Sequence, residues 1–313
     1  MLLAFILYYH GLSLEVIGRF FGVHKTTVMR GLSPLAQVNW QGAVQQGKRF
    51  FSGTMAVDEK WIKIAGGWWY LFVAVDHVSG LPLHVALLPS NAKPSCELFL
   101  LQLKALGDHP KVIVTDGWDA YGQAIVRVFP HAQHLLCRFH ALRAAFRRLR
   151  QQLPHGKVRR RWADKLKGLF RTPSKRTVRR RLGKLQAEAH DSPAPAVVAR
   201  LLAKLPQLLP AVGSTWRPTT SNAAERFLGA FDRFYRAKGP FQSVGSAQKH
   251  VALFMLGSVF ETFSAEAAAE RQGRCPLQVA GYEVGAIPLL HLLNRPNPSR
   301  LRQAIAAGYD LAA

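Results

Sequence analysis

Cysteine is scarce in this chain, and its scarcity excludes two classes of protein. Three cysteines occur among 313 residues, Cys96, Cys137 and Cys275, and they are widely spaced. Such a set supplies neither a disulfide framework nor the paired CxxC spacing of a structural zinc site. We therefore expect a protein of a reducing compartment, the cytoplasm.

Long hydrophobic runs are also lacking. The apolar opening segment, residues 1–10, is too short to cross a bilayer, and it has neither a basic start nor a small-residue cleavage site. We therefore expect no signal peptide and no membrane span, and we interpret this segment as a first core helix.

Acidic residues are few relative to basic ones. The chain has 18 Asp and Glu against 42 Lys and Arg, which gives a formal net charge of +24. An excess of this size predicts an anionic polymer or surface as the partner. DNA or RNA is the first choice and an anionic membrane the second, while a solvated basic face without a partner is the alternative.

The first 35 residues have the pattern of helices joined by a tight turn. Ser13 is a suitable N-cap, Gly22 lies in the turn, and Val28 and Leu32 would hold the last helix to the one before it. This is the helix-turn-helix pattern, although an ordinary helical hairpin has the same outline. As a recognition helix, the last helix would contact DNA through His24, Lys25, Thr26, Thr27 and Arg30.

A strand-rich region follows a polar connector. Two of its strands form a hairpin around Gly66-Gly67, and the apolar run that stops at Thr115-Asp116-Gly117 predicts a buried central strand. The predicted elements are, in order, strands 55–64, 68–76 and 81–88, helix 94–106, strand 111–114, helix 120–128 and strand 131–137. This is the order of a ribonuclease-H-like mixed sheet, so the predicted class is α/β.

The chain becomes strongly basic after residue 137. Between Arg138 and Lys184 there are eighteen Lys and Arg and a single acid, Asp164. Apolar residues recur among them at helical spacing: Leu149, Val158, Trp162, Leu166, Leu169, Phe170 and Leu182. We interpret this as an inserted helical region with an apolar seam and a basic exterior, a composition typical of nucleic-acid binding. Farther on, the chain predicts a helix that starts at Ser221 or Asn222 and carries Glu225.

Three acids in these contexts, Asp58, Asp116 and Glu225, resemble the triad of a DDE transposase of the bacterial insertion-sequence type. The motifs that carry the resemblance are Val57-Asp58-Glu59-Lys60-Trp61 with Trp68-Trp69-Tyr70-Leu71, Val114-Thr115-Asp116-Gly117-Trp118-Asp119-Ala120-Tyr121, Cys137-Arg138-Phe139-His140, and Thr220-Ser221-Asn222-Ala223-Ala224-Glu225-Arg226. The resemblance covers roughly residues 55–260. Together with the patterns above, it divides the chain into a helix-turn-helix DNA-binding region at 1–40, a ribonuclease-H-like catalytic domain at 50–140 and 214–265, a basic helical insertion at 141–213 and a C-terminal tail without an assigned role at 266–313.

The resemblance also implies a reaction and its cofactors. The enzyme would cut DNA at the element's ends and join the freed 3′-hydroxyl to target DNA. Two Mg²⁺ or Mn²⁺ ions about 3.5–4 Å apart serve such displacements, and carboxylates suit these oxygen-preferring ions. Asp58 would lie between the metals, with Asp116 and Glu225 on either side. The implied partner is double-stranded DNA, both terminal inverted repeats and target, bound by a homodimer or larger assembly.

Each acid also has a structural interpretation. Asp116 can form a turn, Asp58 can be an exposed strand residue, and Glu225 can cap its own helix. Asp232 is a rival third acid and Glu188 a more distant one. Three further acids are expected in strands or turns: Glu59, Asp76 and Asp119, the last with a possible supporting role at the site.

Other residues near these motifs are assigned by analogy or by pattern. The resemblance gives Cys137 and His140 a structural or positioning role, although a buried thiol and a core histidine fit equally. Trp61 and the three aromatics at 68–70 are expected in the core, while Trp118 and Trp216 suit either base stacking or packing. Related transposases carry a basic residue about two turns after the glutamate, where this chain has an acid. Four residues would therefore share phosphate contacts: Arg226, Arg233, Arg236 and Lys238.

Two other functions fit the same sequence. One is a non-catalytic DNA-binding protein derived from a transposase, and the other is a ribonuclease-H-like nuclease that cuts without joining. Metal-dependent strand transfer would separate these possibilities.

Overall fold

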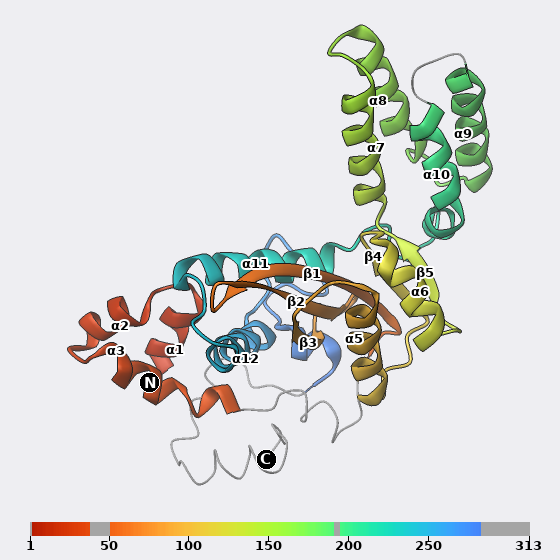
Figure 1. The fold of residues 1–313 in the computed structure, drawn as a ribbon. Coiled ribbons are helices and arrows are strands. Elements are labelled where there is room, and N and C mark those ends of the chain that lie inside the picture. Colours follow the sequence, from red (N-terminus) through yellow and green to blue (C-terminus); the bar gives the residue numbers. More distant parts are fainter. Residues whose placement is uncertain (1, 38–50, 191–194, 283–313) are drawn as a thin grey trace. The chain divides into compact units, whose positions relative to one another are not determined.

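The computed structural model describes residues 2–37, 51–190 and 195–282. They divide into two compact units, residues 1–109 with 223–313, and residues 110–222. The strands are β1 (Thr54–Ile64), β2 (Gly67–Asp76), β3 (Pro82–Leu88), β4 (Val112–Thr115) and β5 (Gln133–Leu136). They belong to a mixed five-stranded sheet with the order β3-β2-β1-β4-β5 (Figure 1).

The helices lie before, between and after the strands. They are α1 (Leu2–Tyr9), α2 (Leu14–Phe21), α3 (Lys25–Leu32), α5 (Lys93–Ala105), α6 (Asp119–Val128), α7 (Arg138–Gln152), α8 (Lys157–Leu169), α9 (Lys175–His190), α10 (Pro195–Leu208), α11 (Asn222–Lys238), α12 (Val244–Phe260) and α13 (Pro276–Ala280), with 3-10 turns at Leu35–Gln37 and Leu209–Ala211. Across the described ranges, no helix is long and apolar enough to cross a membrane.

Strands β1 and β2 form an antiparallel hairpin whose two faces pack against different helices. Alternation along a strand sends successive side chains to opposite faces. On one face, Phe99 of α5 packs against Phe72 with ring centroids 5.3 Å apart. On the other, Ile62 and Ile64 of β1 join the core that includes α11 and α12. The hairpin is therefore covered on both sides, as the mixed α/β class requires.

Helices α11 and α12 bring an aromatic cluster to the core of the first unit. Phe227, Phe231 and Phe234 of α11 recur every three or four residues, so they occupy one helical face. Their rings each lie 5.3 Å from the ring of Phe254 in α12. Burial of four phenyl rings at one contact makes this helix pair a major source of stability.

The N-terminal helices pack on the same core. Tyr8 of α1 is fully buried against Phe234, and Tyr9 packs on Phe254. Ser13 caps α2 by accepting a hydrogen bond from the Val16 amide, as expected. Helix α2 ends at Gly22, whose φ of 66° suits glycine, and α3 follows after the turn. This close succession of α2 and α3 has the outline predicted for residues 13–32.

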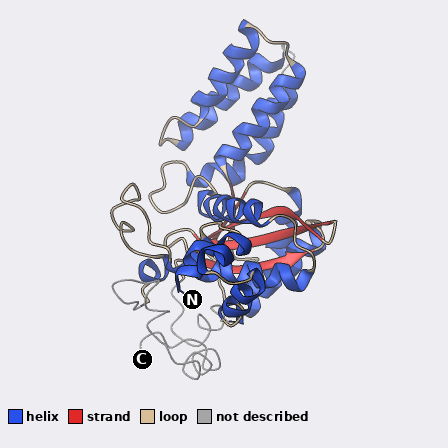
Figure 2. Ribbon diagram, turned by 90° about the vertical axis from the view of Figure 1, so that its left-hand side faces the viewer, coloured by secondary structure: helices blue, strands red, loops and turns tan. Residues whose placement is uncertain are grey.

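The second unit combines two parallel strands with a bundle of helices. Strands β4 and β5 pair in parallel, with Val112, Val114 and Leu135 in a small core. Helices α7, α8, α9 and α10 form a bundle (Figure 2). They pack together around buried apolar side chains. Six of the seven predicted seam residues are buried there, whereas Val158 is 58 % exposed at the start of α8.

Two aromatic residues expected in the core lie on the surface. Trp61 and Trp68 are 60 % and 51 % exposed. Their rings pack edge to face at 4.7 Å near the end of the hairpin, away from the contact between Phe72 and α5. Hydrophobic alternation predicts which face of the sheet a side chain occupies. It does not predict how much of the strand a helix on that face covers.

Some predicted boundaries differ from the structure. The strand predicted at 131–137 is shorter, Gln133–Leu136, because Cys137 is already the N-cap of α7. The tail predicted at 266–313 contains α13 within its described part. Residues 38–50 of the connector and 283–313 of the tail lie outside the described ranges.

A matched pair of glycine substitutions tests the packing of α1 on α12. A Cβ on Gly257 would lie 2.2 Å from the Tyr9 ring, whereas a Cβ on Gly229 of α11 meets nothing within 4 Å. We expect Gly257→Ala to lower the free energy of unfolding by about 1–3 kcal/mol through overpacking. Gly229→Ala should raise it by about 0.5–1 kcal/mol through helix propensity. Chemical denaturation measures both, and equal effects would contradict the proposed contact.

Candidate functional site

Helix α11 runs alongside β1 in the first unit, and two polar contacts fix their register. Lys60 Nζ lies 2.9 Å from Asp232 Oδ1, and the Lys63 amide donates to the Tyr235 hydroxyl at 2.9 Å. Lys63 follows Lys60 along β1, and Tyr235 follows Asp232 along α11. The strand and the helix therefore run in the same direction.

This register places two of the three predicted acids on facing surfaces. Asp58 precedes Lys60 by two residues and therefore projects from the same face of β1, about 7 Å back along the strand. Glu225 precedes Asp232 by two helical turns, so it projects from the same face of α11, about 10 Å back along the helix. Asp58 and Glu225 consequently lie toward the same end of the contact between β1 and α11.

The rival third acid has a structural role in this contact. Asp232 forms ion pairs with Lys60 and with Arg236, each at 2.9 Å. Partial burial raises the pKa of Asp232, but the hydrogen bonds and charges of Lys60 and Arg236 outweigh burial and lower it. Its carboxylate is therefore held by two cations, so Asp232 has a structural role in the contact between β1 and α11.

The other acids considered from the sequence hold turns or surface pairs. Asp76 is 1 % exposed and accepts hydrogen bonds from the amides of Ser52, Val78 and Ser79, so it is a turn residue as expected. Glu188 pairs with Lys165 in the second unit.

Glu59 and Asp119 lie close in sequence to the predicted triad acids. Glu59 accepts a hydrogen bond from Asn91 Nδ2 at 3.2 Å, which ties β1 to the loop before α5. Asp119 begins α6. Glu59 therefore lies in a strand as expected, whereas Asp119 is the first residue of a helix rather than a strand or turn residue.

Asp116 immediately follows β4 in the second unit. Its Oδ1 accepts the Trp118 amide at 2.8 Å, and Gly117 has a φ of 93°, so the chain turns sharply here. The preceding Thr115 is fully buried, and its hydroxyl lies 2.9 Å from His134 Nε2 of β5. Asp116 is thus a turn residue, and it also presents a partly exposed carboxylate at the end of β4. The contact between Thr115 and His134 holds this strand end in place.

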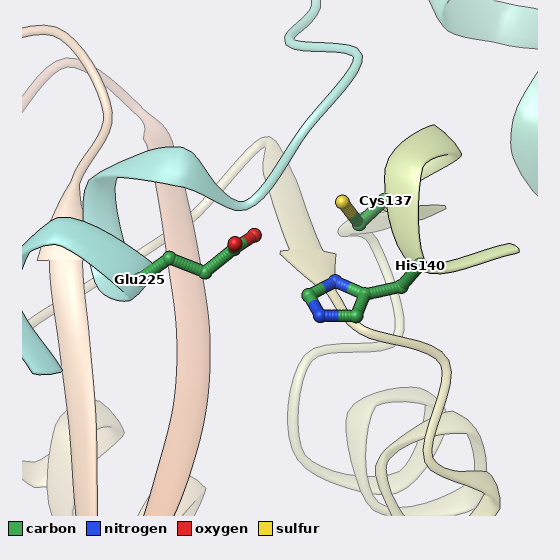
Figure 3. Close-up of side chains that lie close together, drawn as sticks. All are labelled: Cys137, His140 and Glu225. Carbon is green, nitrogen blue, oxygen red and sulfur yellow. The ribbon is translucent and has the colours of Figure 1, made fainter. Parts of the chain in front are cut away.

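Cys137 and His140 lie at the start of α7 (Figure 3). The Cys137 sulfur and an imidazole nitrogen of His140 lie within 4.8 Å of each other. Burial raises the pKa of the Cys137 thiol, but hydrogen bonds with His140 and Ser221 outweigh burial and lower it. The pair joins the start of α7 to the segment before α11, an arrangement consistent with a positioning role. Figure 3 also draws Glu225, which belongs to the first turn of α11 in the first unit.

A cavity of about 930 Å³ lies within the second unit between α7, α10 and the loop after β4. Its floor at the strand end includes Asp116, Trp118 and Asp119. Its helical walls carry six cationic side chains, Arg143, Arg147, Arg148, Arg150, Arg200 and Lys204. The sequence identified the basic character of this region but not which of its cations share a cavity. The spacing of Arg143, Arg147 and Arg150, which lies along one face of a helix, was the available signal.

The basic residues predicted to contact DNA differ in their surroundings. Arg226 and Arg233 are exposed on α11, whereas the exposed Arg236 pairs with Asp232. Lys238 donates to the backbone carbonyls of Tyr8 and Leu12, and burial lowers its pKa to about 7. Its ammonium group therefore stabilises the contact between α11 and α1, where it is withdrawn from phosphate groups.

Most of the predicted recognition residues lie at the start of α3, whereas Arg30 lies in its last turn. The side chains of Lys25, Thr26, Thr27 and Arg30 are exposed. His24 caps α3, with Nδ1 accepting from the Thr26 amide. Gly18 allows α2 to approach the turn closely, because a Cβ there would lie 2.5 Å from the Val23 carbonyl oxygen. Val28 and Leu32 are buried, as predicted.

The two tryptophans proposed from the sequence to stack on bases, Trp118 and Trp216, lie on the surface. Trp118 is 48 % and Trp216 is 53 % exposed, so the core-packing alternative is wrong for both. The guanidinium of Arg217 lies over the Trp216 ring at 4.1 Å.

The five-stranded mixed α/β sheet fits a transposase with a ribonuclease-H-like fold, and comparisons with known proteins agree with this class. Residues 68–144 match the family model of the MULE transposase domain. The chain is also 30 % identical over 126 residues to the transposase for insertion sequence element IS257 in transposon Tn4003 of Staphylococcus aureus. That alignment covers 40 % of this chain and 55 % of the relative, so the chain spans about half the length of the protein it matches.

These two matches support a transposase of an insertion sequence. Transposases of this kind typically use divalent metal ions.

Neutralising Asp232 tests its structural role. Because its pKa is lowered in the folded protein, Asp232 stabilises the fold above its unfolded pKa, and this contribution is lost as pH falls through the folded pKa. We expect Asp232→Asn to lower the free energy of unfolding by about 0.5–1 kcal/mol at pH 7 and by less in acid. Denaturation of both proteins at pH 7 and pH 3 measures the difference. A difference that grows in acid would contradict the ion-pair assignment.

Proposed function

We propose that this protein is a DDE transposase that cuts DNA at the ends of its element and transfers the 3′-ends to target DNA. Asp58, Asp116 and Glu225 are the proposed metal ligands and catalytic residues. The main support is the register of β1 and α11, which directs Asp58 and Glu225 toward the same end of one contact while Asp232 is held by Lys60. The family match supports a DNA-cutting and joining enzyme in general.

The proposed chemistry consists of two displacements at phosphorus. In the first, a water oxygen bonds to the phosphorus at the element's end, the bond to the 3′-oxygen breaks, and that oxygen leaves as a hydroxyl. In the second, this hydroxyl loses its proton and attacks a target phosphodiester, releasing a target 3′-hydroxyl. Two Mg²⁺ or Mn²⁺ ions, when bound, would activate the attacking oxygen and stabilise the leaving one.

The carboxylates suit these ions for simple chemical reasons. Mg²⁺ prefers oxygen ligands and keeps several waters, so a few carboxylates suffice to hold it. Asp116 offers a carboxylate at a strand end, where open α/β sheets bind ligands. Three acids from distant parts of the chain would then form the metal site.

Recognition of DNA is proposed for two regions. The α2–α3 pair would read the inverted repeats through Lys25, Thr26, Thr27 and Arg30, with His24 completing the start of α3. Arg226, Arg233 and Arg236 would contact phosphates near the acids. Because both element ends must be joined, we propose a dimer or larger assembly on DNA, in which binding weakens steeply with salt.

The five regions inferred from the sequence are retained within this proposal. They are a DNA-binding region at 1–40, a catalytic domain at 50–140 and 214–265, a basic helical insertion at 141–213 and a tail at 266–313.

The catalytic assignment predicts that substituting a triad acid abolishes cleavage but leaves DNA binding nearly unchanged. We expect Asp58→Asn and Glu225→Gln each to lower Mg²⁺-dependent cleavage about 1000-fold or more, because loss of a metal ligand costs several kcal/mol of transition-state stabilisation. DNA affinity should change less than about threefold. Labelled duplexes from the DNA that borders the reading frame, incubated with a supercoiled target plasmid, report both cleavage and joining.

Asp164→Asn is the control, because it removes an exposed acid of α8 that belongs neither to the proposed triad nor to the contact between β1 and α11. It should retain most cleavage. Activity that survives Asp58→Asn would refute the site. Cleavage without joining in the wild-type protein would indicate a nuclease, and DNA binding without cleavage in Mg²⁺ or Mn²⁺ would indicate a non-catalytic protein.

The recognition helix predicts a sequence-dependent loss of affinity. We expect Lys25→Ala with Arg30→Ala to weaken binding to a bordering-DNA duplex about 10-fold or more and to weaken binding to a scrambled duplex less. Competition binding at fixed salt measures the ratio. The exposed pair Lys93→Ala with Lys104→Ala on α5 is the charge-matched control. An unchanged ratio would mean that α3 does not read sequence.

A further inference from the structure

The cavity of the second unit has the composition of a site for a flexible polyanion. Four of its cations lie on α7 at Arg143, Arg147, Arg148 and Arg150, and Arg200 and Lys204 follow on α10. Arg143 and Arg147 are one helical turn apart, as are Arg200 and Lys204, so each helix presents a short row of positive charge. Two such rows along one cavity provide successive contacts for a phosphate backbone.

Like charges face each other across this cavity. Desolvation, followed by repulsion from Arg200 and Arg147, lowers the pKa of Arg148. Elsewhere in the same bundle, Lys165 pairs with Glu188 and Lys167 with Asp164. Within the part of the chain that the structure describes, no ion pair involves Arg143, Arg147 or Arg200. A bound anion would relieve the repulsion that these arginines impose on one another.

Planar side chains lie at the end of the cavity next to Asp116. Trp118 and Phe139 line the cavity, and they are 48 % and 54 % exposed. Exposed aromatic rings beside a positively charged groove are the usual elements of single-strand binding, because every base has a face that can stack. A duplex keeps its bases stacked on one another, so it would leave these rings unused.

The size of the cavity also favours a single strand. The cavity volume of about 930 Å³ lies at the upper end of the range for small-molecule sites, whose volumes are roughly 300–1,000 Å³. This is room for a few nucleotides. A duplex is much wider than a single strand, because its major groove alone is about 12 Å across. A whole duplex would therefore need far more space than this cavity offers.

The walls of the cavity are fixed to the strand ends. Lys204 of α10 donates to the Gly117 carbonyl at 3.3 Å, directly beside Asp116. Gln207 of the same helix lies 3.2 Å from His134 Nδ1, and Nε2 of that ring contacts Thr115. Helix α10 is therefore attached to both β4 and β5, and the cationic rows lead to the carboxylate.

We propose that this cavity binds single-stranded DNA, with the phosphates along α7 and α10 and a base stacked on Trp118, so that the strand reaches Asp116. The proposal rests on the proposed function for the identity of the polymer. It adds the substrate form, an unpaired strand end, and the residues that hold it. Local separation of the two strands at the element's end would supply this form.

Equilibrium binding of the full-length protein to a labelled 10-nucleotide single strand, without divalent metal, tests the proposal. The groove variant is Arg143→Ala with Arg147→Ala and Arg200→Ala. Its control is Arg160→Ala with Arg179→Ala and Arg180→Ala, which removes three exposed charges from α8 and α9 outside the cavity. We expect the groove variant to bind at least about 10-fold more weakly, and the slope of log affinity against log salt to fall by about 2. The control should lose less than about threefold.

Substitution of Trp118 separates stacking from charge. Trp118→Ala should weaken single-strand binding about 5- to 150-fold, whereas Trp118→Phe should restore most of the affinity. Duplex binding should change little in either variant. Thermal unfolding of every variant establishes that it is folded.

Three results would overturn the proposal. Equal losses in the groove and control variants would mean that net charge alone binds DNA. An unaffected Trp118→Ala would exclude stacking, and a duplex loss as large as the single-strand loss would assign the cavity to duplex DNA. These readouts need no catalysis, so single-strand binding can hold where strand transfer fails, and each proposal can fail without the other.

Discussion

The packing of α11 along β1 is the contact on which the first unit depends. Three phenylalanines on one face of α11 pack against Phe254, while Lys60 and Asp232 fix the register at the edge of this apolar contact. The apolar burial provides most of the stability, whereas the ion pair, partly exposed, contributes more to alignment than to energy. Because helix and strand run in the same direction, an error of one helical turn would move Glu225 by about 5 Å relative to Asp58. The proposed chemistry therefore depends on a packing contact several residues away from it.

The second unit holds many positive charges close together. Its bundle buries leucine, valine and tryptophan side chains, so the basic residues are displaced to the outside and to the cavity wall. Some of the outer charges have acidic partners, as Lys165 and Lys167 do. The cavity cations instead face one another, an arrangement that costs free energy and that a bound anion would offset. Stability and binding thus make opposite demands on the same helices.

Several parts of the fold could be predicted because they depend on local chemistry. Alternating apolar residues and a glycine-containing turn define the first hairpin, although the turn is Ala65-Gly66 rather than the predicted Gly66-Gly67. The run before Asp116 defines β4. Ser13 was recognisable as a cap, since its hydroxyl satisfies an amide at the start of α2. Periodicity could not show that Trp61 and Trp68 lie beyond the contacts of α5, because coverage of a strand depends on where a distant helix ends. The same limit applies to Lys238, whose buried contact with Tyr8 joins residues 230 positions apart.

The sequence by itself determined the chemistry available to this protein: a large basic excess, an order of strands and helices, and three acids in recognisable contexts. These properties follow from composition and from short-range pattern. Only the tertiary structure decided which of these groups face each other. It directed Glu225 to the face of α11 that meets β1, gave Asp232 to Lys60, and gathered Arg143 and Arg200 around one cavity. The reason is physical: charges act through space over a few ångströms, and folding sets those distances through packing that no local stretch of the chain encodes.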